Sequence, residues 1–210
     1  MKRTLQLLSL ILASAFLHAP SASAALVVTL TPSATLINVG QNAFIDVSIT
    51  SDDLTDSLDG FFANLSITGG SGLAFVDPQS ESFLADSSYV FFGRSGNVIQ
   101  SSLATVVNSP TSIGFSDFSD DGANAPSPRT LDSTFLLARI DFTGVSAGTF
   151  GIEFGTASSF TRDGLSQISF TGPSSITVTA VPEPSSLVLA GIAGVGAVMA
   201  KRRRRKVAAS

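Results

Sequence analysis

One arrangement in the sequence could carry nucleophilic catalysis. The segment Gly144-Val145-Ser146-Ala147-Gly148 fits the G-x-S-x-G pattern, in which a serine on a strand-to-helix turn attacks a carbonyl carbon. Such a serine needs a histidine to accept its proton, and the only histidine, His18, lies in the apolar N-terminal segment. The pentapeptide also joins two predicted strands. It therefore predicts a β-turn, and no Ser-His-Asp triad.

Metal chemistry is restricted in the same way. The chain has no cysteine and no other histidine, which excludes the usual zinc, copper and haem sites. Hard cations need only oxygen ligands, and two acidic loops, at residues 51–60 and 117–132, contain four aspartates each. Neither loop fits the D-x-[DN]-x-[DN]-G pattern, so a solvated acidic loop is the alternative to calcium. The candidate calcium ligands are Asp52, Asp53, Asp56, Asp59, Asp117, Asp120 and Asp121.

Carbohydrate chemistry has no distinct signature. A glycosidase needs two facing carboxylates, yet Glu81 and Glu153, the only glutamates between residues 25 and 180, fall in unrelated segments. Tryptophan is absent and Tyr89 is the only tyrosine, so aromatic sugar platforms would have to come from the phenylalanine pairs at 61–62 and 91–92. We therefore predict that the protein is not an enzyme and disfavour a hydrolase. A polysaccharide-binding module is the alternative.

The N-terminus has the features of a secretory signal peptide. Lys2 and Arg3 precede an apolar run at residues 5–17, and Ala22 and Ala24 form an A-x-A cleavage site. We predict cleavage after Ala24, so residues 1–24 are the signal peptide. An uncleaved N-terminal anchor is the alternative.

The C-terminus has an uncharged apolar segment followed by a basic end. Residues 187–200 would reach only about 21 Å as a helix, against the ~30 Å of a bilayer core. Extending the helix to residue 185 and letting the flanking basic side chains snorkel closes most of that gap. We predict a transmembrane helix at 185–200 and a cytoplasmic end at 201–210. The predicted stop-transfer residues are Lys201, Arg202, Arg203, Arg204, Arg205 and Lys206.

The middle of the chain, residues 25–180, is predicted to lie outside the cytoplasm as one domain. It has 15 acidic and four basic residues, no lysine, and hence a net charge of −11. Such a domain lacks the basic footprint that nucleic-acid binding requires. Without cysteine it has no disulfides, so apolar burial must stabilise it.

Apolar residues in this middle region recur with a period of two. Ala43, Ile45, Val47 and Ile49 share one face of a predicted strand, and residues 61–67 and 136–142 alternate in the same way. Residues 81–86 could form a helical turn. Further predicted strands cover residues 26–30, 35–39, 73–76, 89–92, 98–107, 111–115, 150–154, 167–170 and 176–181. This pattern predicts an all-β fold, an antiparallel two-sheet β-sandwich; a β-solenoid would need a fixed repeat, which we do not find.

The order of features in the tail at 181–210 resembles the PEP-CTERM sorting tail of exported bacterial proteins. Pro182, Glu183 and Pro184 precede the apolar helix and the arginine block. The resemblance implies recognition of this motif by an exosortase-type membrane protease, and association with extracellular polysaccharide. The same tail is also known as an ice-binding-protein C-terminal domain, a label that implies nothing about ice. The two prolines keep the motif extended and accessible, as a processing site requires.

The middle region resembles the cohesin-like jelly roll related to carbohydrate-binding modules, over residues 26–178. The resemblance rests on Gly40-Gln41 before the strand at 44–50, on residues 58–61, and on residues 135–142. It transfers no binding residue to any position here. We expect a membrane-anchored precursor and a mature form at the cell surface or outside the cell. Its expected partners are the membrane, the exosortase, and exopolysaccharide or other envelope proteins.

Overall fold

The computed structural model describes residues 25–53, 56–122, 128–161, 167–172 and 174–181. The predicted signal peptide and the predicted sorting motif, transmembrane helix and basic end lie outside the described residues. Among the described residues, no helix has the length and apolar character needed to cross a bilayer.

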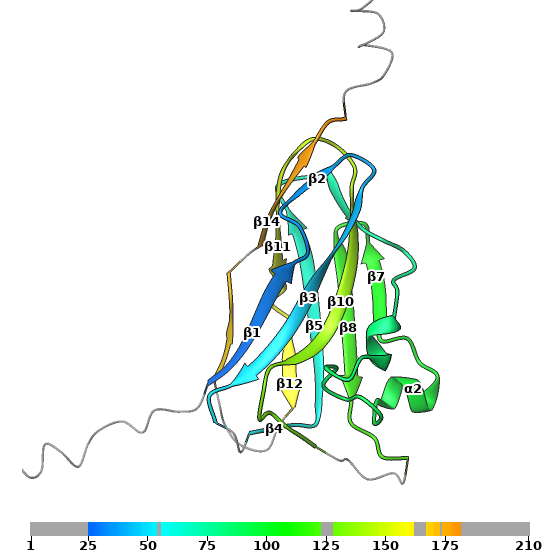
Figure 1. The fold of residues 1–210 in the computed structure, drawn as a ribbon, viewed down its shortest axis with the longest axis vertical. Helices are drawn as coiled ribbons and strands as arrows, with labels where there is room; N and C mark the ends of the chain where they lie inside the picture. Colours follow the sequence, from blue (N-terminus) through cyan, green and yellow to red (C-terminus); the bar gives the residue numbers. More distant parts are fainter. Residues whose placement is uncertain (1–24, 54–55, 123–127, 162–166, 173, 182–210) are drawn as a thin grey trace, which may run out of the picture.

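Two β-sheets face each other and enclose the core (Figure 1). The first has the strand order β13 (Gln167–Phe170), β1 (Ala25–Pro32), β3 (Asn42–Ser51), β10 (Phe135–Gly144) and β6 (Leu73–Phe75). The second has the order β2 (Leu36–Asn38), β14 (Ser174–Thr179), β11 (Gly148–Phe154), β5 (Gly60–Thr68), β8 (Ser112–Phe118) and β7 (Thr105–Ser109), and β12 (Ser159–Thr161) also pairs with β5. A small sheet pairs β4 (Ser57–Leu58) with β9 (Arg129–Thr130). The predicted two-sheet sandwich is confirmed.

The alternation seen in the sequence places the core between the sheets. Ile45, Val47 and Ile49 of β3 are fully buried, and the alternate residues of β5 from Phe61 to Ile67 are buried from the opposite sheet. Because successive strand residues point to opposite faces, the intervening Phe62, Asn64 and Ser66 point outward. The central pair β3–β10 has one β-bulge, between Leu136 and Ala138.

Two edge pairings differ from the predicted antiparallel arrangement. β1 pairs with β13 in parallel, and β14 pairs with β2 in parallel. Both parallel pairs join strands from opposite ends of the chain, which a hairpin cannot connect. The remaining ladders of the two large sheets are antiparallel.

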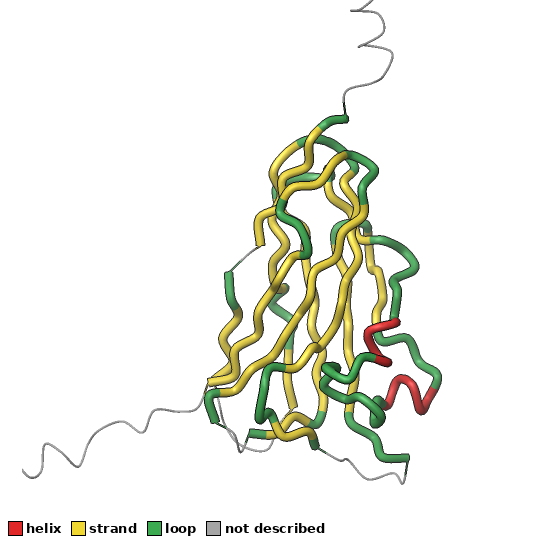
Figure 2. Tube along the Cα trace, viewed as in Figure 1, coloured by secondary structure: helices red, strands yellow, loops and turns green. Residues whose placement is uncertain are grey.

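The segment between β6 and β7 is where the predicted strands are wrong. Residues 89–92 form turns, with only an isolated bridge from Tyr89 to Leu136. Residues 98–100 belong to the short helix α2 (Gly96–Gln100), and strand structure resumes only at Thr105. The side chain of Ser95 caps α2 by accepting a hydrogen bond from Val98 N, and Ser101 ends it in the left-handed conformation. The predicted helical turn at 81–86 is confirmed as the 3-10 helix η2 (Ser82–Ala85). Figure 2 shows both helical segments together at one side of the sandwich.

Candidate functional site

A buried carboxylate joins the helical segment to the sandwich. Asp117, near the end of β8, is 3% exposed. Its Oδ2 accepts hydrogen bonds from the Tyr89 hydroxyl and the Ser95 hydroxyl, both at 2.5 Å. Its Oδ1 accepts from the backbone N–H groups of Asn97 (3.1 Å) and Phe118 (2.7 Å). Four donors therefore hold this carboxylate, which fixes residues 89–97 against the second sheet.

Tyr89 is the aromatic partner in this network. Its side chain is fully buried and makes edge-on contacts with the rings of Phe83 and Phe91. Burial raises the pKa of the Tyr89 hydroxyl far above its ordinary value, and the nearby Asp117 carboxylate raises it further. Tyr89 is therefore a neutral hydrogen-bond donor.

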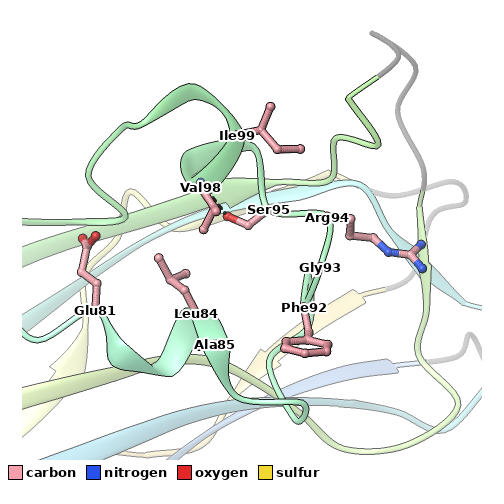
Figure 3. Close-up of a pocket in the computed structure, with 9 residues that line it drawn as sticks. All are labelled: Glu81, Leu84, Ala85, Phe92, Gly93, Arg94, Ser95, Val98 and Ile99. Atoms are coloured by element: carbon pink, nitrogen blue, oxygen red, sulfur yellow. Dashed lines mark hydrogen bonds between the residues drawn. The ribbon is translucent and has the colours of Figure 1, made fainter.

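A cleft of about 460 Å³ opens between η2 and α2. Its apolar lining includes Leu84 and Val98, whose side chains face each other across the opening (Figure 3). The Glu81 carboxylate lies at one end, whereas the Arg94 side chain extends away from the cleft at the other end. The remaining lining residues are Ala85, Phe92, Gly93, Ser95 and Ile99.

A second cavity of about 400 Å³ shares Glu81 with this cleft and is lined by Asp77 and by residues of β7. Glu81 also connects this region to β7, because its Oε1 accepts hydrogen bonds from Thr105 N (2.9 Å) and the Thr105 hydroxyl (3.0 Å). Large apolar side chains stay exposed along both openings. We call them the apolar strip: Phe92, Val98, Ile99, Leu103 and Val106.

The outer face of the seven-stranded sheet adjoins the apolar strip at Val106, which pairs with Gly114. Phe62 of β5 is 42% exposed there, with Ser116 of β8 as its cross-strand partner. The next outward pair along the same two strands is Asn64 and Gly114. The exposed Phe62 ring is therefore next to small and polar residues on these two strands.

The candidate calcium ligands do not come together. Within the described parts of the chain, no group of three or more histidine, cysteine, aspartate or glutamate side chains could hold a metal ion. Asp117 is occupied by the four donors above, and buried Asp56 accepts a hydrogen bond from the Ser51 hydroxyl. The Oδ1 atom of Asp120 accepts a hydrogen bond from Gly122 N. Two of these aspartates thus hold the fold together from within.

The G-x-S-x-G segment forms the predicted turn between β10 and β11. The N–H groups of Val145 and Ser146 both donate to the carbonyl of Gly72. A Cβ added at Gly144 would lie 2.8 Å from the Asn38 carbonyl oxygen, so close strand packing requires glycine there. The strand-to-helix setting of a nucleophile is not present at this segment.

Sequence reasoning missed the cleft because the apolar pattern of residues 98–107 predicts one strand. Two local signals favour the helix: Ser95 stands where a helix N-cap would be, and Gly96 and Asn97 interrupt the β-branched pattern. The contact of Tyr89 with Asp117 has no sequence signal, since it joins residues 28 positions apart.

Comparison with known proteins identifies the tail. Residues 180–205 match the model of the PEP-CTERM protein-sorting motif. The match implies an exported protein that an exosortase processes. No curated protein sequence matches the chain.

Cohesin domains are among the solved structures that the chain resembles. A type II cohesin of Acetivibrio cellulolyticus has 16% identity and a TM-score of 0.46, covering 72% of this chain and 95% of that one. CaCohA2 of Clostridium acetobutylicum has 16% identity and a TM-score of 0.47, covering 73% and 91%. The seventh ScaB type I cohesin of Pseudobacteroides cellulosolvens has 14% identity and a TM-score of 0.46, covering 76% of this chain and 95% of that one. No binding residue, partner or role is taken from this likeness.

Proposed function

We propose that this is an exported, exosortase-processed protein of the cell surface or extracellular matrix, whose β-sandwich is a non-enzymatic binding and structural domain. The observation that carries the proposal is the sorting-motif match at residues 180–205, which begins just after β14, the last strand of the sandwich. The membrane-spanning segment at 185–200 holds the precursor until Pro182, Glu183 and Pro184 are recognised.

Both processing sites fit the boundaries of the folded domain. Cleavage after Ala24 would leave all of the described residues of β1, from Ala25 to Pro32, in the mature protein. At the other end β14 stops at Thr179 and Val181 is 53% exposed, so the sorting motif begins beyond the last strand pairing. Neither cut would remove a residue from the core.

A non-enzymatic role is supported by what the reactive groups do. Ser146 is part of a strand-joining turn, and the Asp117 and Glu81 carboxylates accept hydrogen bonds that connect separate segments. These groups are used for packing and connection, which is typical of a binding scaffold.

The mass of the mature protein purified from cells tests this proposal. We expect an N-terminus at Ala25 and loss of the residues that follow the sorting motif. Replacing the motif glutamate, Glu183→Ala, should leave the tail attached, whereas Val145→Ala, at an exposed turn of the sandwich, should be processed normally. A mature protein that retains residues 1–24 and is labelled by cytosolic reagents would contradict export.

A second candidate function is polysaccharide binding by the outer face of the seven-stranded sheet. The exposed Phe62 ring, beside Ser116 and Asn64, offers a stacking surface with hydrogen-bonding neighbours. The test is a pull-down with exopolysaccharide from the producing cells. This function is supported if Phe62→Ala abolishes binding and Phe92→Ala does not. Equal binding by the unchanged protein and both variants would exclude this face.

A further inference from the structure

Exposed apolar side chains are concentrated beside α2. Twelve large apolar residues are exposed among the described residues, and five of them form the apolar strip within residues 92–106. The strip side chains are between 46% and 72% exposed. An exposed apolar cluster at a cavity is typical of an interaction site, because it is costly to leave in water.

The fold holds this surface in place. The Ser95 and Asn97 side chains turn inward, toward Asp117 and the Ser116 carbonyl, so the next two residues of the helix, Val98 and Ile99, face solvent. On the other side of the cleft, Glu81 fixes the start of η2 to β7 through Thr105. The cleft is therefore preformed, which reduces the entropy lost on binding.

The charge around the cleft selects its partner. Glu81 lines both cavities and Asp77 lines the second. Arg94 also lines the cleft, and its side chain points away from Glu81 (Figure 3). Because the region 25–180 carries a net charge of −11, a second copy and an anionic membrane are both repelled.

We propose that the cleft between η2 and α2 is a docking site for a basic peptide segment of a partner protein, which inserts an apolar side chain between Leu84 and Val98. Lysine or arginine residues of that segment would face Glu81 and Asp77. The identity of the partner as an envelope protein rests on the proposed function, whereas the chemistry of the cleft does not.

Fluorescence anisotropy with labelled synthetic peptides tests the proposal on the protein purified from cells. The first peptide contains lysine, serine and leucine; a second has glutamate for each lysine, and a third has serine for each leucine. We expect binding of the first peptide alone, weakening as NaCl is added. Peptide binding is measured on purified protein and does not depend on its export. A protein found in the wrong compartment would therefore contradict the proposed function without affecting this test.

Matched variants locate the site. The double variant Val98→Ser/Ile99→Ser should weaken binding of the lysine–leucine peptide by about tenfold or more, since two exposed anchoring contacts are lost. The control Val145→Ser, at an exposed valine on the β10–β11 turn, should bind like the unchanged protein. Circular dichroism verifies that each variant is folded.

Four results would overturn the proposal. They are no binding of the lysine–leucine peptide, equal binding of the glutamate peptide, binding that the double variant leaves unchanged, and binding that salt does not weaken. If the double variant instead abolishes binding to phosphatidylcholine vesicles, or abolishes concentration-dependent self-association, the strip serves a lipid surface or a second copy in place of a basic peptide.

Discussion

At the scale of the residue, the most informative group is Asp117. A carboxylate in an acidic loop was a candidate calcium ligand, yet it lies almost fully buried and accepts four hydrogen bonds from three segments. A buried charge is tolerated only when donors surround it, so this residue stabilises the attachment of α2.

Removal of the Asp117 carboxylate should be costly. Asp117→Ala leaves the buried Tyr89 and Ser95 hydroxyls without their acceptor, and we expect a loss of about 3 kcal/mol in the free energy of unfolding. Urea denaturation measures it. Asp132→Ala, at an exposed aspartate, is the control and should change stability by less than about 0.5 kcal/mol. Equal effects would contradict the network.

Tyr89 predicts a pH dependence at the alkaline end. Its pKa is raised in the folded protein, so its stabilising contribution is fully present below about pH 10, the ordinary tyrosine value, and is lost as pH rises above it. As the only tyrosine in a chain without tryptophan, Tyr89 alone gives the tyrosinate absorbance. We expect that signal to appear together with unfolding. An ionisation that precedes unfolding would contradict the buried assignment.

At the scale of the element, the turn after β10 accounts for the G-x-S-x-G segment, whose sequence resembles a catalytic serine motif. An added Cβ at Gly144 would lie 2.8 Å from the Asn38 carbonyl oxygen and 2.9 Å from Val178 Cγ1, both of which belong to strands of the opposite sheet. The motif glycine is thus a packing requirement of the sandwich.

Two glycines give a matched test of that explanation. Gly144→Ala should lower the free energy of unfolding by about 2 kcal/mol, because backbone and core atoms would have to move. Gly172→Ala should be near neutral, since nothing lies within 4 Å of its added Cβ. Thermal unfolding of both variants gives the comparison, and equal melting temperatures would refute the steric argument.

The elements also show what a sequence can predict. The strands at 43–50 and 61–67 were predictable because one face of each is buried and the alternation is regular. The strand at 136–142 was predictable from the alternation that follows its bulge, from Ala138 to Phe142. The structure of residues 89–107 was not predictable. Some of their apolar side chains are buried beside the sandwich and others are exposed beside the cleft, so the apolar residues do not recur at a regular interval. The parallel pairing of the edge strands was not predictable either, because the paired residues are more than 130 positions apart in the sequence.

At the scale of the whole molecule, charge should influence stability more than any single ion pair. The salt bridge between Arg139 Nε and Asp46 Oδ1, for example, measures 2.7 Å and is partly exposed. We expect the melting temperature to rise with added NaCl, because salt screens the repulsion among the 15 acidic residues of this region.

Calcium chloride at matched ionic strength provides the control for that experiment. Since the described aspartates do not form a metal-binding group, the two salts should raise the melting temperature equally. A rise specific to calcium would show that the acidic loops hold the ion.

The ends of the sandwich give the molecule a direction. β14 finishes at the top of Figure 1, and α2 lies toward the lower end of the second sheet. A molecule still tethered through residues 185–200 would therefore stand with its last strand nearest the lipid and the α2 end farthest from it. In that orientation the length of the sandwich would separate the cleft from the headgroups and leave it open to a neighbouring molecule.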